Sequence, residues 1–145
     1  MAELVERIAA ELENIDGVLA LVPSAGSLPE LSELELAGVA ALVHSFYNGV
    51  ENIVKQVLQS RGIALPAGDS WHKELIELAA ESKVISGETS HSIREYLAFR
   101  HFFTHAYAFD LDPQRLEPLV ANLGCVSDAF KRDLAKAASP LPPAT

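Results

Sequence analysis

One short segment of this chain concentrates side chains that can do phosphate and proton chemistry. From Arg100 to Tyr107 the sequence places a guanidinium, two imidazoles and a phenol within eight residues. Arg100 carries a positive charge that does not titrate, and an imidazole such as that of His105 can give or take a proton near neutral pH. This combination suits phosphate chemistry, because a fixed cation can stabilise negative charge on phosphoryl oxygens while an imidazole moves a proton.

The spacing of these residues along a regular helix does not direct all of them to one point. A helix advances about 100° per residue, so Arg100 and Tyr107 share one stripe, and His101 and His105 share another. Arg100 and His105 diverge by roughly 140° on the same scale. A widened turn, a long reach of the arginine or a second subunit would be needed to bring both side chains to one phosphate.

The run Arg100-x4-His105-x-Tyr107 resembles the R-x4-H-x-Y signature of HEPN-superfamily ribonucleases of the HepT kind, the toxin halves of HepT/MNT toxin–antitoxin pairs. Chain length, helical pattern and the place of the motif late in the fourth predicted helix are similar to that family along most of residues 2–136. One departure is His101, at a position that often holds asparagine or another polar residue in such motifs. The role of this position therefore stays open.

The resemblance implies a metal-independent endoribonuclease that needs no cofactor and leaves 2′,3′-cyclic phosphates. In it, His105 would be the base or acid and Arg100 the charge clamp. The resemblance also implies a homodimer in which two motifs face each other, which would remove the angular mismatch. In this family, which forms type VII-like pairs, the nucleotidyltransferase antitoxin (MNT) attaches AMP to the motif's tyrosine, here Tyr107, and the added phosphate blocks the RNA cleft.

Other side chains could extend an RNA-binding surface. We expect His101 and Arg94 on the fourth helix, and Lys73 at the start of the third, to contact the substrate. Lys73 follows Trp71 and His72, and this trio offers an aromatic face, an imidazole and an ammonium group for stacking a base and touching a phosphate. The packed N-terminus of a helix would explain the trio equally well.

Two other interpretations of the motif stay open. His101 and His105, four residues apart on one helix, have the spacing of a zinc half-site, although no Glu lies between them as a metalloprotease motif would require. Alternatively, Arg100 pairs with Glu95 or Glu51. His105 then serves only to cap the last carbonyls of its own helix.

Net charge is the main observation against an RNA-cutting enzyme. The 145 residues carry a net charge of -9, whereas affinity for nucleic acid comes largely from Lys and Arg. Residues 90–107 hold two arginines and three histidines against the single acid Glu95, so an RNA site would be a small basic cleft in an acidic body. The rival function is a non-catalytic HEPN-type helical interaction module that binds a nucleotidyltransferase partner.

Five helices are predicted to position these residues. Apolar residues recur at helical spacing over residues 2–22, 32–61, 71–82, about 88–107, and 113 onward. Ser32 and Glu35 form a capping-box pattern, and Pro118 kinks the last helix or marks its true start. On the second helix we place Glu51 on the face opposite the apolar stripe. The fold class that follows is all-α: an up-and-down, HEPN-like bundle of four main helices plus an additional helix.

Residues 1–138 are expected to form a single HEPN-like helical domain, and residues 139–145, with three prolines, a flexible tail. No run approaches the ~18–20 apolar residues of a membrane span, and the acidic N-terminus is unlike a signal peptide. We therefore expect a cytoplasmic protein with no membrane partner. The single cysteine, Cys125, cannot form an intramolecular disulfide and is expected in the core.

Overall fold

Helices make up the regular structure of residues 2–105 and 110–138, the part of the chain that the computed structural model describes, and no strand occurs there. The elements are α1 (Ala2–Leu21), the 3-10 helix η1 (Ala25–Glu30), α2 (Glu33–Ser60), α3 (Trp71–Glu81), α4 (Gly87–His105) and α5 (Pro113–Ala138). Four long helices with a shorter α3 confirm the predicted all-α bundle. The short η1 was not predicted from the sequence.

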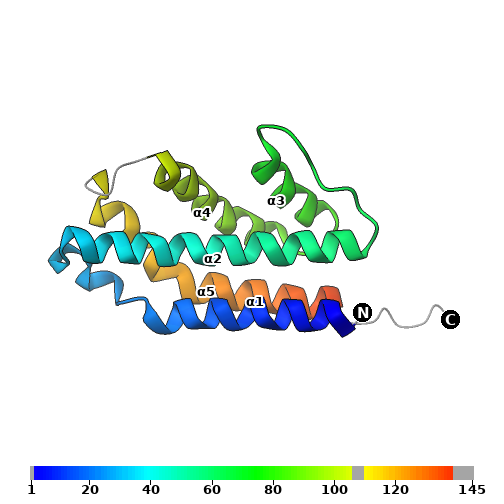
Figure 1. Cartoon of the computed structure of the whole chain (residues 1–145), viewed down its shortest axis with the longest axis horizontal. Helices are drawn as coiled ribbons and strands as arrows, with labels where there is room; N and C mark the ends of the chain where they lie inside the picture. The colour runs from blue at the N-terminus through cyan, green and yellow to red at the C-terminus, as the bar shows by residue number, and fades with distance from the viewer. Residues whose placement is uncertain (1, 106–109, 139–145) are drawn as a thin grey trace.

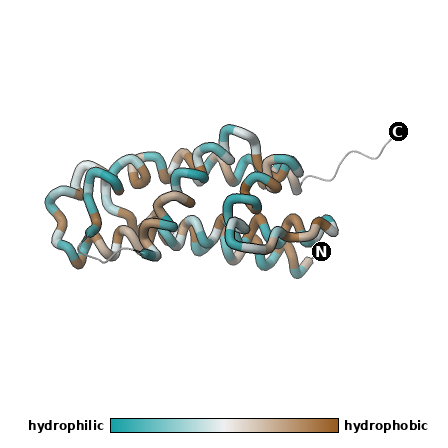
Figure 2. The backbone as a smooth tube through the Cα atoms, turned by 90° about the horizontal axis from the view of Figure 1, so that it is seen from above, coloured by the Kyte–Doolittle hydropathy of each residue, from teal (hydrophilic) through white to brown (hydrophobic). Residues whose placement is uncertain are grey.

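The longest helix, α2, runs through the middle of the bundle (Figure 1). α1 and α5 lie along one side of it, and α3 and α4 lie along the other. Successive long helices run in opposite directions, so the end of α4 and the start of α5 meet at the same end of the molecule. Figure 2 shows hydrophilic and hydrophobic residues interleaved along the helices, as expected for elements with one buried face.

Both ends of α2 are fixed by local chemistry, and the capping box at its start was predicted from the sequence. The Ser32 hydroxyl accepts a hydrogen bond from the Glu35 backbone N–H at 3.1 Å, and the Glu35 carboxylate accepts one from the Ser32 N–H at 3.0 Å. This reciprocal capping box satisfies donors that have no partner inside the helix. At the other end, Gly62 adopts a positive φ of 74°, which a residue without Cβ tolerates without strain.

The apolar stripe of α2 forms the centre of the core. Phe46, Val50 and Ile53 have no solvent-exposed surface, and the ring of Phe46 lies edge-on to that of Tyr96 of α4, with centroids 5.2 Å apart. Glu51, predicted on the outward face, is instead buried and only 3% exposed. The prediction was wrong because α3 packs against the face of α2 that lies outside the apolar stripe and carries Glu51.

α5 begins as predicted. The Asp112 carboxylate accepts a hydrogen bond from the Gln114 N–H at 2.9 Å, and Pro113 is the first helical residue. Pro118 lies inside the helix, so it does not mark the helix start. The Tyr96 hydroxyl donates a hydrogen bond to the Leu119 carbonyl at 2.6 Å and so ties α4 to α5 just after the proline.

Cys125 is exposed on α5, not buried in the core as expected, because the buried stripe of that helix runs through its neighbours Leu123 and Val126. Within the described residues, none of the helices combines the length and the apolar character that crossing a membrane requires. The proposed tail, residues 139–145, lies outside the described residues.

Candidate active site

The motif residues stand on the last turns of α4, at the end of the bundle where α5 begins. α4 is anchored at its start by Ser86, whose hydroxyl accepts a hydrogen bond from the Thr89 N–H at 3.1 Å. The Ser86 N–H in turn donates to the Asp133 carboxylate of α5 at 2.9 Å. Arg100 and His105 therefore belong to a helix fixed at its far end, whereas Tyr107 lies outside the described residues.

The two histidines of the motif lie side by side on the surface. The ring centroids of His101 and His105 are 4.6 Å apart, and both side chains are exposed. Nδ1 of His105 lies 2.8 Å from the His101 carbonyl oxygen and 3.1 Å from the Thr104 hydroxyl. A proton on Nδ1 satisfies the carbonyl, and Nε2 then keeps its lone pair for an incoming donor. The predicted capping of a carbonyl by His105 is thus present, and it leaves one ring nitrogen for chemistry.

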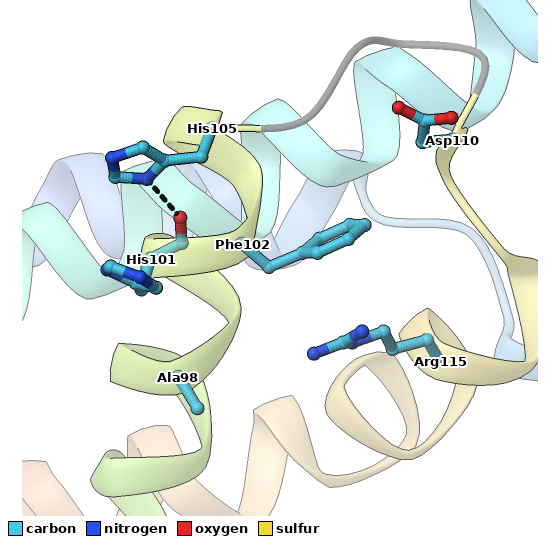
Figure 3. A pocket seen from close by; sticks show the side chains of 6 residues that line it. All are labelled: Ala98, His101, Phe102, His105, Asp110 and Arg115. Atoms are coloured by element: carbon cyan, nitrogen blue, oxygen red, sulfur yellow. Dashed lines mark hydrogen bonds between the residues drawn. The ribbon is translucent and has the colours of Figure 1, made fainter.

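An open cleft of about 430 Å³ adjoins the two imidazoles. Its lining residues come from the end of α4, the segment just before α5 and the first turn of α5: Ala98, His101, Phe102, His105, Asp110 and Arg115 (Figure 3). The guanidinium carbon of Arg115 lies 4.3 Å from the centroid of the Phe102 ring. The cleft therefore holds two imidazoles, one permanent cation and one carboxylate.

Arg100 does not line this cleft. Its Nε atom is buried and has no hydrogen-bond partner among the described residues, and no ion pair joins it to Glu51 or Glu95 there. Burial, followed by the nearby charge of Arg100, lowers the pKa of His44 on α2. Arg100 thus lies near His44 of α2, and within one subunit it does not join His105 in the cleft lining.

Beside Arg100, a buried chain of polar groups links α2 to α3. Oε2 of Glu51 accepts a hydrogen bond from the Tyr47 hydroxyl at 2.5 Å and lies 2.5 Å from Nδ1 of His72. Tyr47 is fully buried, and burial together with the Glu51 hydrogen bond raises the pKa of its hydroxyl above the ordinary value. The sequence did not predict this cluster, because Glu51 and His72 are 21 residues apart and lie on two helices.

The remaining predicted substrate-binding residues are spread over the surface. Arg94 forms an ion pair with Glu77 of α3 at 3.7 Å, and Lys73 is exposed at the start of α3. The Trp71 ring is covered by His72, with centroids 3.6 Å apart, and by the Lys55 ammonium at 4.8 Å. Neither Arg94 nor Lys73 lines the cleft, and of the three predicted substrate-binding residues only His101 does.

The described residues offer no third ligand for a zinc ion at His101 and His105. In residues 2–105 and 110–138, no group of three or more His, Cys, Asp or Glu side chains is arranged to hold a metal ion. His101 and His105 are close enough to share a ligand, but Nδ1 of His105 already faces a carbonyl. The arrangement is better suited to proton transfer than to coordination.

Sequence reasoning did not single out Phe102, Asp110 or Arg115 as site residues, although they line the cleft. Asp110 and Arg115 follow α4 in the chain. Their contact with α4 depends on the tertiary structure, so the pattern of residues along one helix does not reveal it. The only signal in the sequence was Asp112-Pro113, which starts a helix directly after the motif and so brings its first turn near the histidines.

Comparison with known proteins assigns a family to this arrangement. The model of a family described as HepT-like protein matches residues 38–140, a segment that contains most of α2, all of α3 and α4, and α5. Searches of curated proteins and of solved structures gave no match. The matched segment is more than half of the chain and includes Arg100, His105 and the cleft between α4 and α5. The chain belongs to the HepT-like family, as its R-x4-H-x-Y motif predicted.

Proposed function

We propose that this chain is the toxin of a type VII-like HepT/MNT toxin–antitoxin pair and acts as a metal-independent endoribonuclease. Membership of the HepT-like family supports this class of function. The observation that carries the proposal is the pair of exposed imidazoles, His101 and His105, beside an open cleft. A 2′-hydroxyl that attacks its neighbouring phosphate needs a proton acceptor, and an accessible imidazole nitrogen supplies one.

In the proposed reaction, Nε2 of His105 takes the proton of the 2′-hydroxyl. The 2′-oxygen then attacks the adjacent phosphorus, and the bond to the 5′-oxygen breaks to leave a 2′,3′-cyclic phosphate and a 5′-hydroxyl. The proton on the imidazole can pass to the departing 5′-oxygen. DNA lacks the 2′-hydroxyl and is not cut. His101, whose ring lies 4.6 Å away, assists in holding the phosphate.

The charge clamp in this proposal is Arg100, acting across a symmetric homodimer. Within one subunit the Nε atom of Arg100 is buried, and Arg100 is absent from the cleft lining. A second copy placed against α4 would bring its own motif to the same groove, so that the arginine of one subunit and His105 of the other could act on one phosphate. The dimer is thus part of the proposed site.

Control by a nucleotidyltransferase antitoxin of the MNT type is the second part of the proposal. The modified residue is Tyr107, two positions after His105 in the sequence. AMP on this tyrosine would add a negative phosphate and an adenosine close to the imidazole pair. Both repulsion and bulk would then keep RNA out.

A second candidate function is a helical interaction module that binds a nucleotidyltransferase without cutting RNA. The net charge of -9 favours it, because an acidic body repels a polyanion. The interior position of the Arg100 Nε atom also fits a packing role for this residue. The two candidates differ in one measurable property, the cleavage of RNA.

The deciding experiment incubates purified, unmodified protein with a generic RNA in EDTA and analyses the fragment ends. His105→Ala is the test variant. His91→Ala is the matched control, because His91 is an exposed histidine on the same helix that does not line the cleft. Circular dichroism establishes that both variants keep their helical content, and mass spectrometry establishes that Tyr107 carries no AMP.

Cleavage by the wild type and by His91→Ala, but not by His105→Ala, with cyclic phosphate ends, is the expected result. Cleavage that stops in EDTA would instead favour a metal ion bound at His101 and His105. Equal inactivity of all three unmodified proteins would favour the interaction module.

A further inference from the structure

We infer that Arg115 is a substrate-binding residue that holds a phosphate of the RNA chain in the cleft beside His101 and His105. The inference rests on the proposed ribonuclease function and adds the cation that this function lacks within one subunit. Arg115 lies in the first turn of α5, 10 residues after His105 in the sequence, and it lines the same cleft.

The Phe102 ring presents the Arg115 guanidinium to the cleft. The guanidinium carbon lies 4.3 Å from the ring centroid, a cation–π contact that orients the planar group without neutralising its charge. No ion pair involves Arg115 within the described residues. The backbone N–H of Arg115 also donates a hydrogen bond to the Asp112 carbonyl at 3.0 Å, which fixes the base of the side chain. Its N–H groups are therefore oriented and still available to an anion.

The distribution of charged side chains around the cleft favours binding of an anion at Arg115. Arg100 is absent from the lining, so Arg115 is the one permanent cation among the cleft residues. Asp110 is the one carboxylate among them, and in Figure 3 the Phe102 ring lies between it and the guanidinium. An anion bound on the α4 side of Arg115 would thus meet the guanidinium while the ring separates it from Asp110. A guanidinium suits phosphate because its N–H groups can donate two parallel hydrogen bonds.

The geometry selects an extended strand over a single nucleotide. In Figure 3 the rings of His101 and His105 project to one side of the last turns of α4, and Phe102 and Arg115 lie to the other side. The imidazoles and the guanidinium thus offer two separate contacts, one for each of two phosphates. A single-stranded RNA that crosses the end of α4 can place the attacked phosphate at His105 and a neighbouring phosphate at Arg115. The substrate class is therefore a single strand with at least two consecutive phosphates.

Binding of a fluorescently labelled single-stranded RNA, followed by anisotropy over a range of salt concentrations, tests this inference without depending on cleavage. The test variant is Arg115→Gln. The matched control is Arg132→Gln, which removes the same charge from an exposed position on the same helix, outside the cleft. A third variant, Arg115→Lys, keeps the charge but loses the planar contact with Phe102.

Arg115→Gln is expected to weaken RNA binding about tenfold. It should also reduce the slope of the logarithm of the binding constant against the logarithm of salt concentration by about 0.7, the value for one phosphate contact to a single strand. Arg132→Gln should bind as the wild type does, and Arg115→Lys should fall between the two. Equal affinity of Arg115→Gln and wild type would overturn the inference, as would equal weakening by Arg132→Gln or the absence of binding by the wild type at low salt.

The result separates the inference from the proposed function. A wild type that cuts RNA while Arg115→Gln binds and cuts equally well removes Arg115 from the site and leaves the ribonuclease in place. A wild type that binds through Arg115 but cuts nothing removes the enzyme and keeps the phosphate contact.

Discussion

Glu51 and His72 come from different helices and meet with Oε2 and Nδ1 2.5 Å apart. The same carboxylate oxygen accepts a hydrogen bond from the Tyr47 hydroxyl, so the buried side chain of Glu51 joins α2 to α3. A carboxylate that is only 3% exposed is tolerated when hydrogen bonds replace its water. This contact fixes how α3 packs beside the helix that carries the motif.

Glu51→Leu is expected to lower the free energy of unfolding by roughly 2 kcal/mol, because it leaves the buried Tyr47 hydroxyl and the His72 imidazole without their acceptor. Urea unfolding measures the change. The double variant with Tyr47→Phe should lose less than the sum of the two single losses, since both changes remove the same hydrogen bond. Strict additivity would show that the hydrogen bond contributes nothing to stability.

A close contact between α1 and α2 predicts opposite effects for two glycine substitutions on α2. A Cβ added at Gly49 would lie 3.0 Å from Cγ1 of Ile15, which is itself buried, so Gly49→Ala should destabilise the fold by about 1 kcal/mol. Gly38 has no such neighbour within 4 Å, and Gly38→Ala should stabilise the fold by roughly 0.5–1 kcal/mol through helix propensity. Thermal unfolding of both variants checks the contrast, and stabilisation by both would mean that Ile15 moves aside freely.

His44 should make stability depend on pH. Burial and then the charge of Arg100 lower its pKa in the folded state, while the Glu51 carboxylate acts in the opposite direction. The unfolded state therefore binds more protons as the pH falls below about 6.5, and the free energy of unfolding should decrease over that range. His44→Leu should flatten this slope between about pH 7 and pH 5. Parallel slopes for both proteins in urea titrations would exclude His44 as their source.

Arg100→Met separates a chemical role of Arg100 from a packing role. The Nε atom is buried without a hydrogen-bond partner in the described part of the chain, so replacing the guanidinium by an apolar group should cost less than about 1 kcal/mol of stability. RNA cleavage should nevertheless be lost, because the proposed charge clamp is removed. Urea unfolding and the cleavage assay are run on the same preparation. A variant that unfolds readily would assign Arg100 to the structure of the α2–α4 interface.

Tyr107→Phe tests the proposed control by the antitoxin. The variant lacks the hydroxyl that would accept AMP, so coexpression with the nucleotidyltransferase should leave its mass unchanged and its RNA cleavage intact. Wild-type protein from the same coexpression should gain the mass of AMP and lose activity. AMP found on the Tyr107→Phe chain would place the modification on another residue.

The sequence was most informative where structure depends on neighbouring residues. The capping box at Ser32 and the start of α5 at Pro113 are local, and each was visible in the order of side chains. The family was equally accessible, because Arg100, His105 and Tyr107 lie within one short segment.

The residues that sequence reasoning misplaced depend on contacts between distant segments. Glu51 looked solvent-facing on a helical stripe, and only the packing of α3 shows why a carboxylate can be buried there. Cys125 looked like a core residue by type, yet its position on α5 faces outward. Arg115 was not singled out from the sequence, because its partner Phe102 belongs to another helix.

Pro118 has a consequence for local motion at the proposed phosphate contact. Because proline has no N–H, the Gln114 carbonyl lacks the donor that a helix normally supplies four residues later. The Tyr96 hydroxyl fastens the Leu119 carbonyl directly after this gap. The free energy of the opening that allows amide hydrogen exchange should therefore be lower for residues 114–117 than for residues 119–134. The proline leaves one helical hydrogen bond unmade between the turn that carries Arg115 and the rest of α5, and the buried Leu116 ties that turn to the core.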